Sequence, residues 1–279
     1  MIPVMIDSGA WSAYTQKEEI SLSAYIDYIK ELLEKGWDFE FLNLDVVGDA
    51  KTSYRNWKRM RREGLEPWPV FHGLVTVGER KGADTEQQWL RRYLESSDKL
   101  ALGGIAFVPT TRRQMFLDTL WENFLIDDDR MPKVRVHGLG LTSFTLMRRY
   151  PWYSVDSGSW MRLGVYGKVC LPRWKGGEWD YTQPYVLGFS HKSPTRGEKG
   201  KHFDNLGPKE QEIVMRYLTS IGVSLGTSRT VDGEEEVVEP GVGNHYLTRC
   251  EVNALYFARS THGLVWPRPF KARVPKGLL

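Results

Sequence analysis

Apolar and polar residues follow a pattern along the first half of the chain that predicts strands alternating with helices. Short apolar or β-forming runs occur at residues 4–6, 39–44, 68–71, 100–106, 134–138 and 153–155. Helical spacing of apolar side chains marks residues 21–35, 51–63, 84–94, 114–125 and 143–150. Because parallel strands need crossover connections, this alternation predicts parallel βα units. Six consecutive units favour an α/β fold of the (β/α)8 TIM-barrel type, with a doubly wound open sheet as the alternative.

The alternation stops after Arg162. Beyond it, the pattern predicts strands at residues 165–171, 185–189 and 223–225, and helices at residues 209–221 and 250–259. It also predicts a polar loop at residues 191–207 and an acidic loop or hairpin at residues 230–243. This pattern does not locate the seventh and eighth barrel strands. We therefore expect a single domain over residues 1–279, with residues 1–162 as its catalytic core strands. Residues 163–279 would supply the rest of the barrel and an irregular C-terminal elaboration.

Composition narrows the class of protein. A chain of 279 residues with 41% hydrophobic content can bury a full core. Its two cysteines, Cys170 and Cys250, are too few for a disulfide framework and indicate a reducing, cytoplasmic environment. The sequence predicts neither secretion nor membrane insertion, because it contains no long apolar run. A net charge of +3 permits nucleic-acid binding without requiring it.

One short motif occurs twice. Asp7-Ser8-Gly9 and Asp156-Ser157-Gly158 both follow a predicted strand, and a tryptophan follows each two residues after the glycine. Because active sites of parallel barrels collect at the carboxyl ends of strands, the two acids could share one pocket. The alternative is that Asp-Ser-Gly only forms a turn.

Polar or glycine residues stand at the end of each predicted core strand. They are Asp7, Asp45, His72-Gly73, Gly103-Gly104, His137-Gly138 and Asp156. This set suits a flat polar ligand, because a carboxylate can accept two N–H bonds, glycine lets backbone approach a ring, and Trp11 could stack on it. Two further carboxylates on opposite sides of a sugar carbon would suit glycosyl transfer.

In order and spacing, these segments resemble the guanine transglycosylases, which exchange a guanine in nucleic acid for a 7-deazaguanine base on a (β/α)8 barrel. Asp7-Ser8-Gly9-Ala10-Trp11 looks like the family's Asp-Ser-Gly-Gly-aromatic segment, Gly103-Gly104-Ile105-Ala106 its Gly-Gly-Leu-Ala strand end, and His137-Gly138-Leu139-Gly140 its Met-Gly-Val-Gly. His72-Gly73 falls where the family has Gln-Gly-Gly, and Arg162 where it has the arginine of Pro-Thr-Arg. The resemblance covers residues 4–162.

The resemblance also implies roles. Asp7 would be the general acid/base and Asp156 the nucleophile, while Trp11 stacks on the base. Asp45 would bind the guanine edge, and the backbone of Gly103, Gly104 and Ile105 would contact the base. The substrate site would be completed by His72, Gly73, His137, Gly138 and Arg162.

Departures from the family pattern decide the expected polymer. The Cys-x-Cys-x-x-Cys cluster with which the tRNA enzymes hold structural zinc is missing, and Cys250 with His245 or His262 would be at most a remnant. We therefore expect no structural zinc and no cofactor. These departures resemble the shorter DpdA-type DNA-guanine transglycosylases of phages and bacterial DNA-modification clusters. DNA is the expected polymer and a free 7-deazaguanine base the second substrate. The alternatives are tRNA, a non-catalytic nucleic-acid-binding barrel, or a hydrolase of free sugars.

Basic residues would complete the nucleic-acid contact. We expect the phosphates to be bound by six of them: Arg59, Arg62, Arg112, Arg113, Lys168 and Arg173. The alternative for this set is that its members are solvated surface charges.

Overall fold

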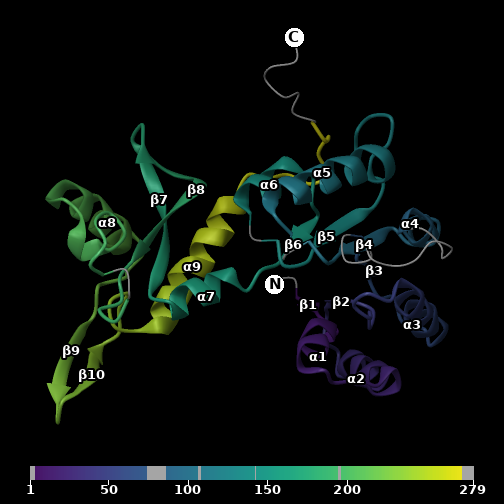
Figure 1. Cartoon of the computed structure of the whole chain (residues 1–279), viewed down its shortest axis with the longest axis horizontal. Coiled ribbons are helices and arrows are strands. Elements are labelled where there is room, and N and C mark those ends of the chain that lie inside the picture. The colour runs from purple at the N-terminus through teal and green to yellow at the C-terminus, as the bar shows by residue number, and fades with distance from the viewer. Residues whose placement is uncertain (1–3, 74–85, 106–107, 142, 194–195, 272–279) are drawn as a thin grey trace. The chain divides into compact units, whose positions relative to one another are not determined.

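The computed structural model describes residues 4–73, 86–105, 108–141, 143–193 and 196–271 (Figure 1). The chain divides into two compact units. Unit 1 comprises Met1–Asp156 and Val265–Leu279, and unit 2 comprises Ser157–Leu264. The division falls six residues before the change of pattern at Arg162, directly after the second candidate acid.

Unit 1 is built on parallel strands that pair in sequence order. They are β1 (Met5–Ile6), β2 (Glu40–Phe41), β3 (Val70–Phe71), β4 (Lys99–Leu102), β5 (Arg135–Gly138) and β6 (Ser154–Val155). β1 pairs with β2, and β3 to β6 form a consecutive parallel ladder; a single parallel bridge between Leu42 and Trp68 connects the two groups. The order never reverses among the described strands, unlike that of a doubly wound sheet. A closed barrel is not seen within the described residues.

The inner side of these strands is filled by side chains from distant strands. Trp68 is fully buried, donates its indole N–H to Glu40 of β2, and contacts the rings of His137 in β5 and Tyr153 beside β6. Glu40 also binds Lys99 of β4. Trp68 therefore contacts residues of β2 and β5 and the residue before β6, and links these strands through one buried side chain.

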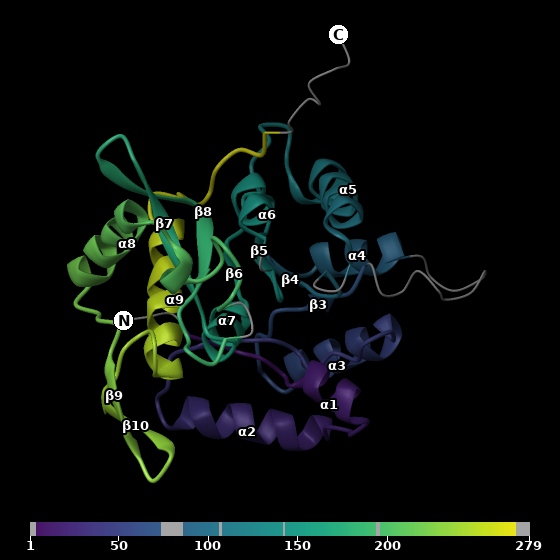
Figure 2. The same ribbon diagram turned by 60° about the vertical axis from the view of Figure 1, so that its left-hand side comes forward.

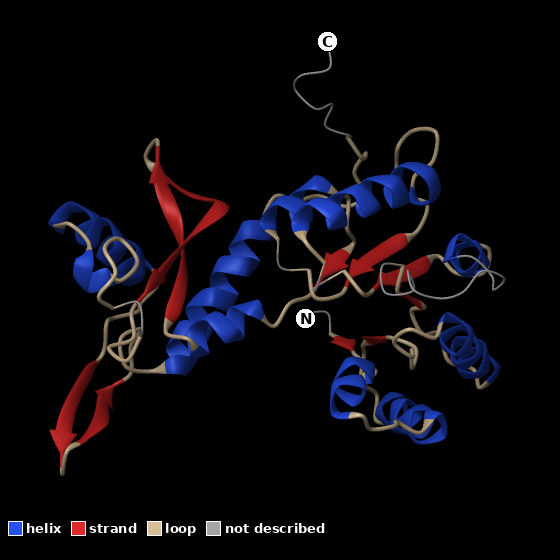
Figure 3. Ribbon diagram, viewed as in Figure 1, coloured by secondary structure: helices blue, strands red, loops and turns tan. Residues whose placement is uncertain are grey.

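Helices connect the strands, as the sequence predicts. They are α1 (Ala10–Gln16), α2 (Leu22–Glu34), α3 (Ala50–Arg62), α4 (Glu86–Leu94), α5 (Thr110–Leu120) and α6 (Phe144–Arg149). A π-helical turn, Trp121–Leu125, extends α5, and α5 and α6 lie together beside the strands (Figure 3). Ser21, Asp49 and Ser143 cap α2, α3 and α6 through their side chains. The first two residues of the helix predicted at residues 84–94 lie outside the described residues.

The chain returns to unit 1 after unit 2 and completes its core. Phe270 is buried and stacks on Tyr150, with ring centroids 5.6 Å apart. Arg268 donates to the carbonyl oxygens of Arg148 and Tyr150. Residues 265–271 therefore cover the end of α6.

Unit 2 has a different architecture. Its elements are α7 (Ser159–Val165), β7 (Lys168–Lys175), β8 (Glu178–Gly188), a 3-10 turn (Phe203–Asn205), α8 (Pro208–Ser220), β9 (Thr227–Val231), β10 (Glu234–Glu239) and α9 (Tyr246–Thr261). β7 and β8 form an antiparallel hairpin, and so do β9 and β10. α9 packs against α7 and β7, as Figure 2 shows. The strand predicted at residues 223–225 is wrong, because this segment is a loop.

Two close contacts fix α9 within unit 2. Gly164 of α7 lies against Cys250, and a Cβ at Gly164 would stand only 2.5 Å from its sulfur. Buried Asn253 accepts from the Cys170 amide at 2.7 Å and donates to the carbonyls of Trp160 and Lys168. Neither α9 nor any other described helix combines the length and apolar character needed to cross a membrane.

Candidate active site

The strand order of unit 1 brings the predicted site residues to one edge. Asp7 follows β1, Asp45 lies four residues beyond β2, His72 follows β3, and Asp156 follows β6. His137 lies inside β5, one residue earlier than the strand end. Because the strands are parallel and consecutive, their carboxyl ends lie on the same edge of the curved sheet.

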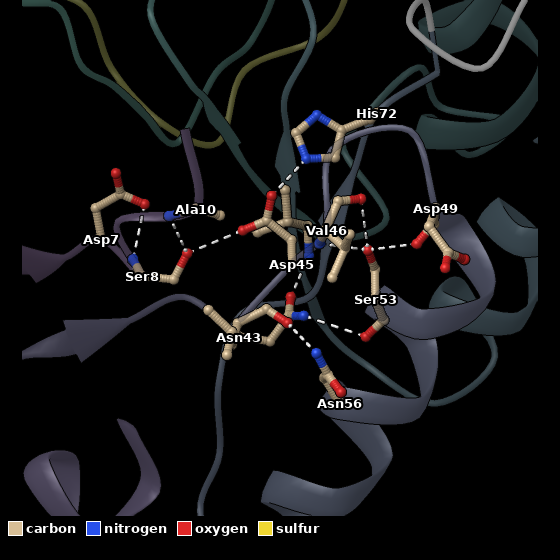
Figure 4. A network of polar contacts seen from close by, with 12 residues as sticks. Asp7, Ser8, Ala10, Asn43, Asp45, Val46, Asp49, Ser53, Asn56 and His72 are labelled. Carbon is tan, nitrogen blue, oxygen red and sulfur yellow. Dashed lines mark hydrogen bonds and ion pairs between the residues drawn. The ribbon is translucent and has the colours of Figure 1, made fainter. Parts of the chain in front are cut away.

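Asp45 is the centre of a buried polar network (Figure 4). Its carboxylate accepts the Ser8 hydroxyl at Oδ1, 2.9 Å away, and is bound at Oδ2 by His72 Nε2 at 2.6 Å. Below it, Asn43 accepts the Val70 amide at 2.7 Å and so ties β2 to β3. These contacts hold Asp45 in one orientation. Because Ser8 directly follows Asp7, its hydrogen bond also ties Asp45 to the segment that carries Asp7.

Gly103 makes room for the imidazole of His72. A Cβ at Gly103 would lie 2.5 Å from His72 Cε1 and 2.6 Å from Nδ1. This glycine was expected to let a base approach the backbone, but the position of its missing Cβ is taken by the imidazole of His72. Gly104 has φ +72°, a left-handed conformation that glycine adopts without strain. Ile105 is buried, and a Cβ at Gly73 would collide with the ring of Phe116.

The carboxyl group of Asp156 accepts a backbone hydrogen bond and is also exposed to solvent. Its Oδ1 accepts the Gly140 amide at 2.7 Å and lies 3.7 Å from His137 Nε2. Its side chain is 58% exposed, whereas that of His137 is 5% exposed. A Cβ at Gly138 would press on Trp152, which explains the glycine beside this pair. Among the described residues the hydrogen bond to this carboxyl group is made at Oδ1, and more than half of the side chain remains exposed.

Asp7 has a raised pKa. Solvent reaches one side of the residue, but the protein around the carboxyl desolvates it, and this burial is the largest cause. The negative charges of Asp45 and Asp156 raise its pKa further, while the amides of Ser8 and Gly9 partly oppose the shift. Asp7 therefore retains a proton to a higher pH than an ordinary aspartate does, as a general acid requires.

Helix α1 and a cavity adjoin the acids. Trp11 is 45% exposed and its ring centroid lies 5.7 Å from that of Tyr14. A cavity of about 680 Å³ lies between α1 and the turn after β2, lined by residues that include Tyr14, Lys17, Asp45 and Val46. Asp45 is the predicted site residue that reaches this cavity. Sequence reasoning missed Tyr14, since α1 itself was not predicted.

Two serines were also missed. Ser8 positions Asp45, and Ser154 binds His137 Nδ1 through its hydroxyl at 2.8 Å. The signal for Ser154 was its place two residues before Asp156, because residues i and i+2 of a strand share a face.

The residues predicted to bind phosphates differ in their exposure and in their ion pairs. Arg62 and Arg112 are exposed, and Arg59 is paired with Glu63 at 3.0 Å. Arg113 is a correction: it is buried and donates to the carbonyl of Val108 at 2.7 Å, so it is not on the surface that a phosphate would meet. Arg162, Lys168 and Arg173 belong to unit 2; Arg162 and Arg173 are exposed and Lys168 is half-buried.

Neither cysteine belongs to unit 1, the unit that carries the candidate acids. Cys170 and Cys250 are buried and unpaired, and both are in unit 2. Searching the described residues for three His, Cys, Asp or Glu side chains placed to hold a metal ion gives none. Comparison with protein-family models, curated proteins and solved structures finds no match, so the site is interpreted from its own geometry.

Proposed function

We propose that the protein is a DNA-guanine transglycosylase, which exchanges guanine in DNA for a free 7-deazaguanine base such as the 7-cyano form. One observation carries the proposal: Asp7, Asp45 and Asp156 stand at one edge of a parallel sheet, close enough for the other two charges to raise the pKa of Asp7. An acid with a raised pKa paired with a second, exposed acid is the arrangement that retaining glycosyl transfer needs. The consecutive strand order supports a (β/α)8 barrel as the scaffold.

The chemistry takes two displacements. A guanine is flipped out of the stack, because its C1′ cannot be attacked inside a duplex. Asp156 then attacks C1′, the bond to N9 breaks, and Asp7 gives its proton to the departing base. In the return step Asp7 takes the N9 proton of the 7-deazaguanine, N9 attacks C1′, and the carboxylate of Asp156 is released. Two displacements restore the original sugar configuration.

Base recognition is assigned to Asp45. Both of its oxygens already accept hydrogen bonds from Ser8 and His72, which orients the carboxylate, and each oxygen retains a second lone pair for the N–H groups of a guanine edge. The adjoining cavity of about 680 Å³ has the size of small-ligand sites. Trp11 offers an exposed ring for stacking.

The test is incorporation of labelled 7-cyano-7-deazaguanine into guanine-containing DNA. Wild type should incorporate label, and Asp156→Asn and Asp7→Asn should lower the rate by at least about a hundredfold. Asp27→Asn is the matched control, because it makes the same change at an exposed position of α2. Asp156→Asn incorporating label at the wild-type rate would refute the mechanism.

The polymer is tested in parallel. DNA is proposed because the cysteine cluster of the tRNA enzymes is missing from the sequence. The same assay on tRNA transcripts decides between the two, and incorporation into tRNA alone would overturn DNA. Binding without turnover, unchanged in Asp7→Asn and Asp156→Asn, would instead identify a non-catalytic nucleic-acid-binding protein. DNA affinity should fall steeply with salt if the exposed arginines bind phosphates.

A further inference from the structure

His137 faces two different oxygen groups on the neighbouring strand. It pairs directly with Ser154 in the parallel ladder of β5 and β6, and its Nδ1 lies 2.8 Å from the Ser154 hydroxyl. Its Nε2 lies 3.7 Å from Oδ1 of Asp156, two residues further along β6. Because these three side chains share one face of the sheet, they form a continuous row from the strand interior to the exposed acid.

The surroundings of His137 favour the neutral imidazole. Burial lowers the pKa of His137, and the nearby charge of Asp156 opposes that shift less strongly. Arg135, two residues earlier on β5, is engaged with Glu40 and Asp98. A neutral imidazole has one N–H and one nitrogen lone pair, so the two ring nitrogens must play different roles.

Electrostatics select between the two tautomers. If Nδ1 carried the proton and donated it to Ser154, the lone pair of Nε2 would face the Asp156 carboxylate at 3.7 Å. If Ser154 donates its hydroxyl to Nδ1, the N–H of Nε2 faces the carboxylate instead. The second arrangement is favoured because it directs a positive dipole end at an anion.

We propose that Ser154 is a positioning residue that fixes His137 with its proton on Nε2, so that the imidazole N–H faces Oδ1 of Asp156, which the Gly140 amide holds, and Oδ2 is left to attack the sugar. The proposal rests on the proposed function, in which Asp156 is the nucleophile. Oδ2 forms the bond to C1′ as the bond from C1′ to N9 breaks. When N9 of the incoming base displaces Asp156, the electron pair of the C1′–Oδ2 bond returns to the carboxylate. The two N–H donors then stabilise the charge that reappears on Oδ1.

The first experiment needs no turnover. Long-range ¹H–¹⁵N NMR of ¹⁵N-histidine-labelled protein at pH 7 reports which nitrogen of each imidazole is protonated, and the chain has six histidines, so His137 is assigned with His137→Gln. Wild type should show His137 protonated on Nε2 alone. Ser154→Ala should give mixed tautomers, and Ser154→Thr, which keeps the hydroxyl, should restore the wild-type signal. A wild-type His137 protonated on Nδ1 would overturn the proposal, as would a spectrum that Ser154→Ala leaves unchanged.

The second experiment uses the exchange assay. Ser154→Ala should lower kcat by roughly two- to tenfold, the range that the net contribution of one hydrogen bond between neutral groups represents, with KM for DNA unchanged. Ser154→Thr should recover most of the rate. A loss in KM alone, or no loss, would overturn the positioning role. Absence of exchange in wild type would refute the proposed function and with it the catalytic role of Ser154, while the NMR result would still decide the tautomer.

Discussion

The contact between Gly103 and His72 gives a prediction whose size follows from the geometry. In Gly103→Ala the new methyl would stand 2.5 Å from His72 Cε1, about 1 Å short of an ordinary carbon contact. The imidazole must move by about that much, and its 2.6 Å bond to Asp45 then exceeds hydrogen-bond range. Overpacking costs about 1–3 kcal/mol and a lost bond to a charged group about 1.5–3 kcal/mol. Since one displacement causes both losses, we expect a total of about 2–4 kcal/mol.

A double-mutant cycle isolates this contact. The free energy of unfolding would be measured by urea titration for wild type, Gly103→Ala, His72→Ala and the double variant. With the imidazole removed, Gly103→Ala should cost less than about 0.5 kcal/mol. Gly197→Ala is the control, because no atom of the described residues lies within 4 Å of its new methyl. An equal cost of Gly103→Ala with and without His72 would refute the reasoning.

Three further predictions test other parts of the chain. The native protein holds the Asp7 proton more tightly than the unfolded chain, so this proton stabilises the fold at low pH and the contribution is lost as the pH rises through the native pKa, above 3.8. Asp7→Asn should therefore have a higher Tm than wild type at pH 7 and no higher Tm below pH 3.8. A difference in Tm that does not change with pH would contradict the raised pKa of Asp7. Asn253→Ala leaves a buried amide without its partner and should cost about 2–4 kcal/mol in urea unfolding, against less than about 0.5 if the network is unimportant. Burial raises the pKa of Cys170 to about 12 and also raises that of Cys250, so neither thiol should react with Ellman's reagent at pH 8 until urea is added; a native thiol that reacts at the rate of free cysteine would show otherwise.

The sequence predicted the parts of unit 1 that depend on local pattern. Strand ends carrying Asp7, Asp45 and Asp156 could be located because a short apolar run followed by polar residues marks each strand. α1 was missed because it follows Gly9, which has φ +76°, and has no side-chain N-cap, so the segment reads as a turn.

Features that depend on distant contacts could not be predicted in this way. The imidazole that fills the space over Gly103 comes from another strand. Arg112 and Arg113 looked alike, but successive helical side chains point about 100° apart, so one is exposed and the other buried. The β7–β8 hairpin had a usable signal, since Gly176-Gly177 is a two-residue turn of the hairpin type.

The return of the chain to unit 1 after Leu264 has a consequence for biosynthesis. Phe270 stacks on Tyr150 within the core of unit 1, yet 119 residue positions lie between them, and all of unit 2 is among these. A ribosome working from the N-terminus must therefore finish unit 2 before Phe270 exists. The hydrophobic face around Tyr150 stays uncovered during that interval, and unit 1 reaches its final packing only after unit 2 has been synthesised.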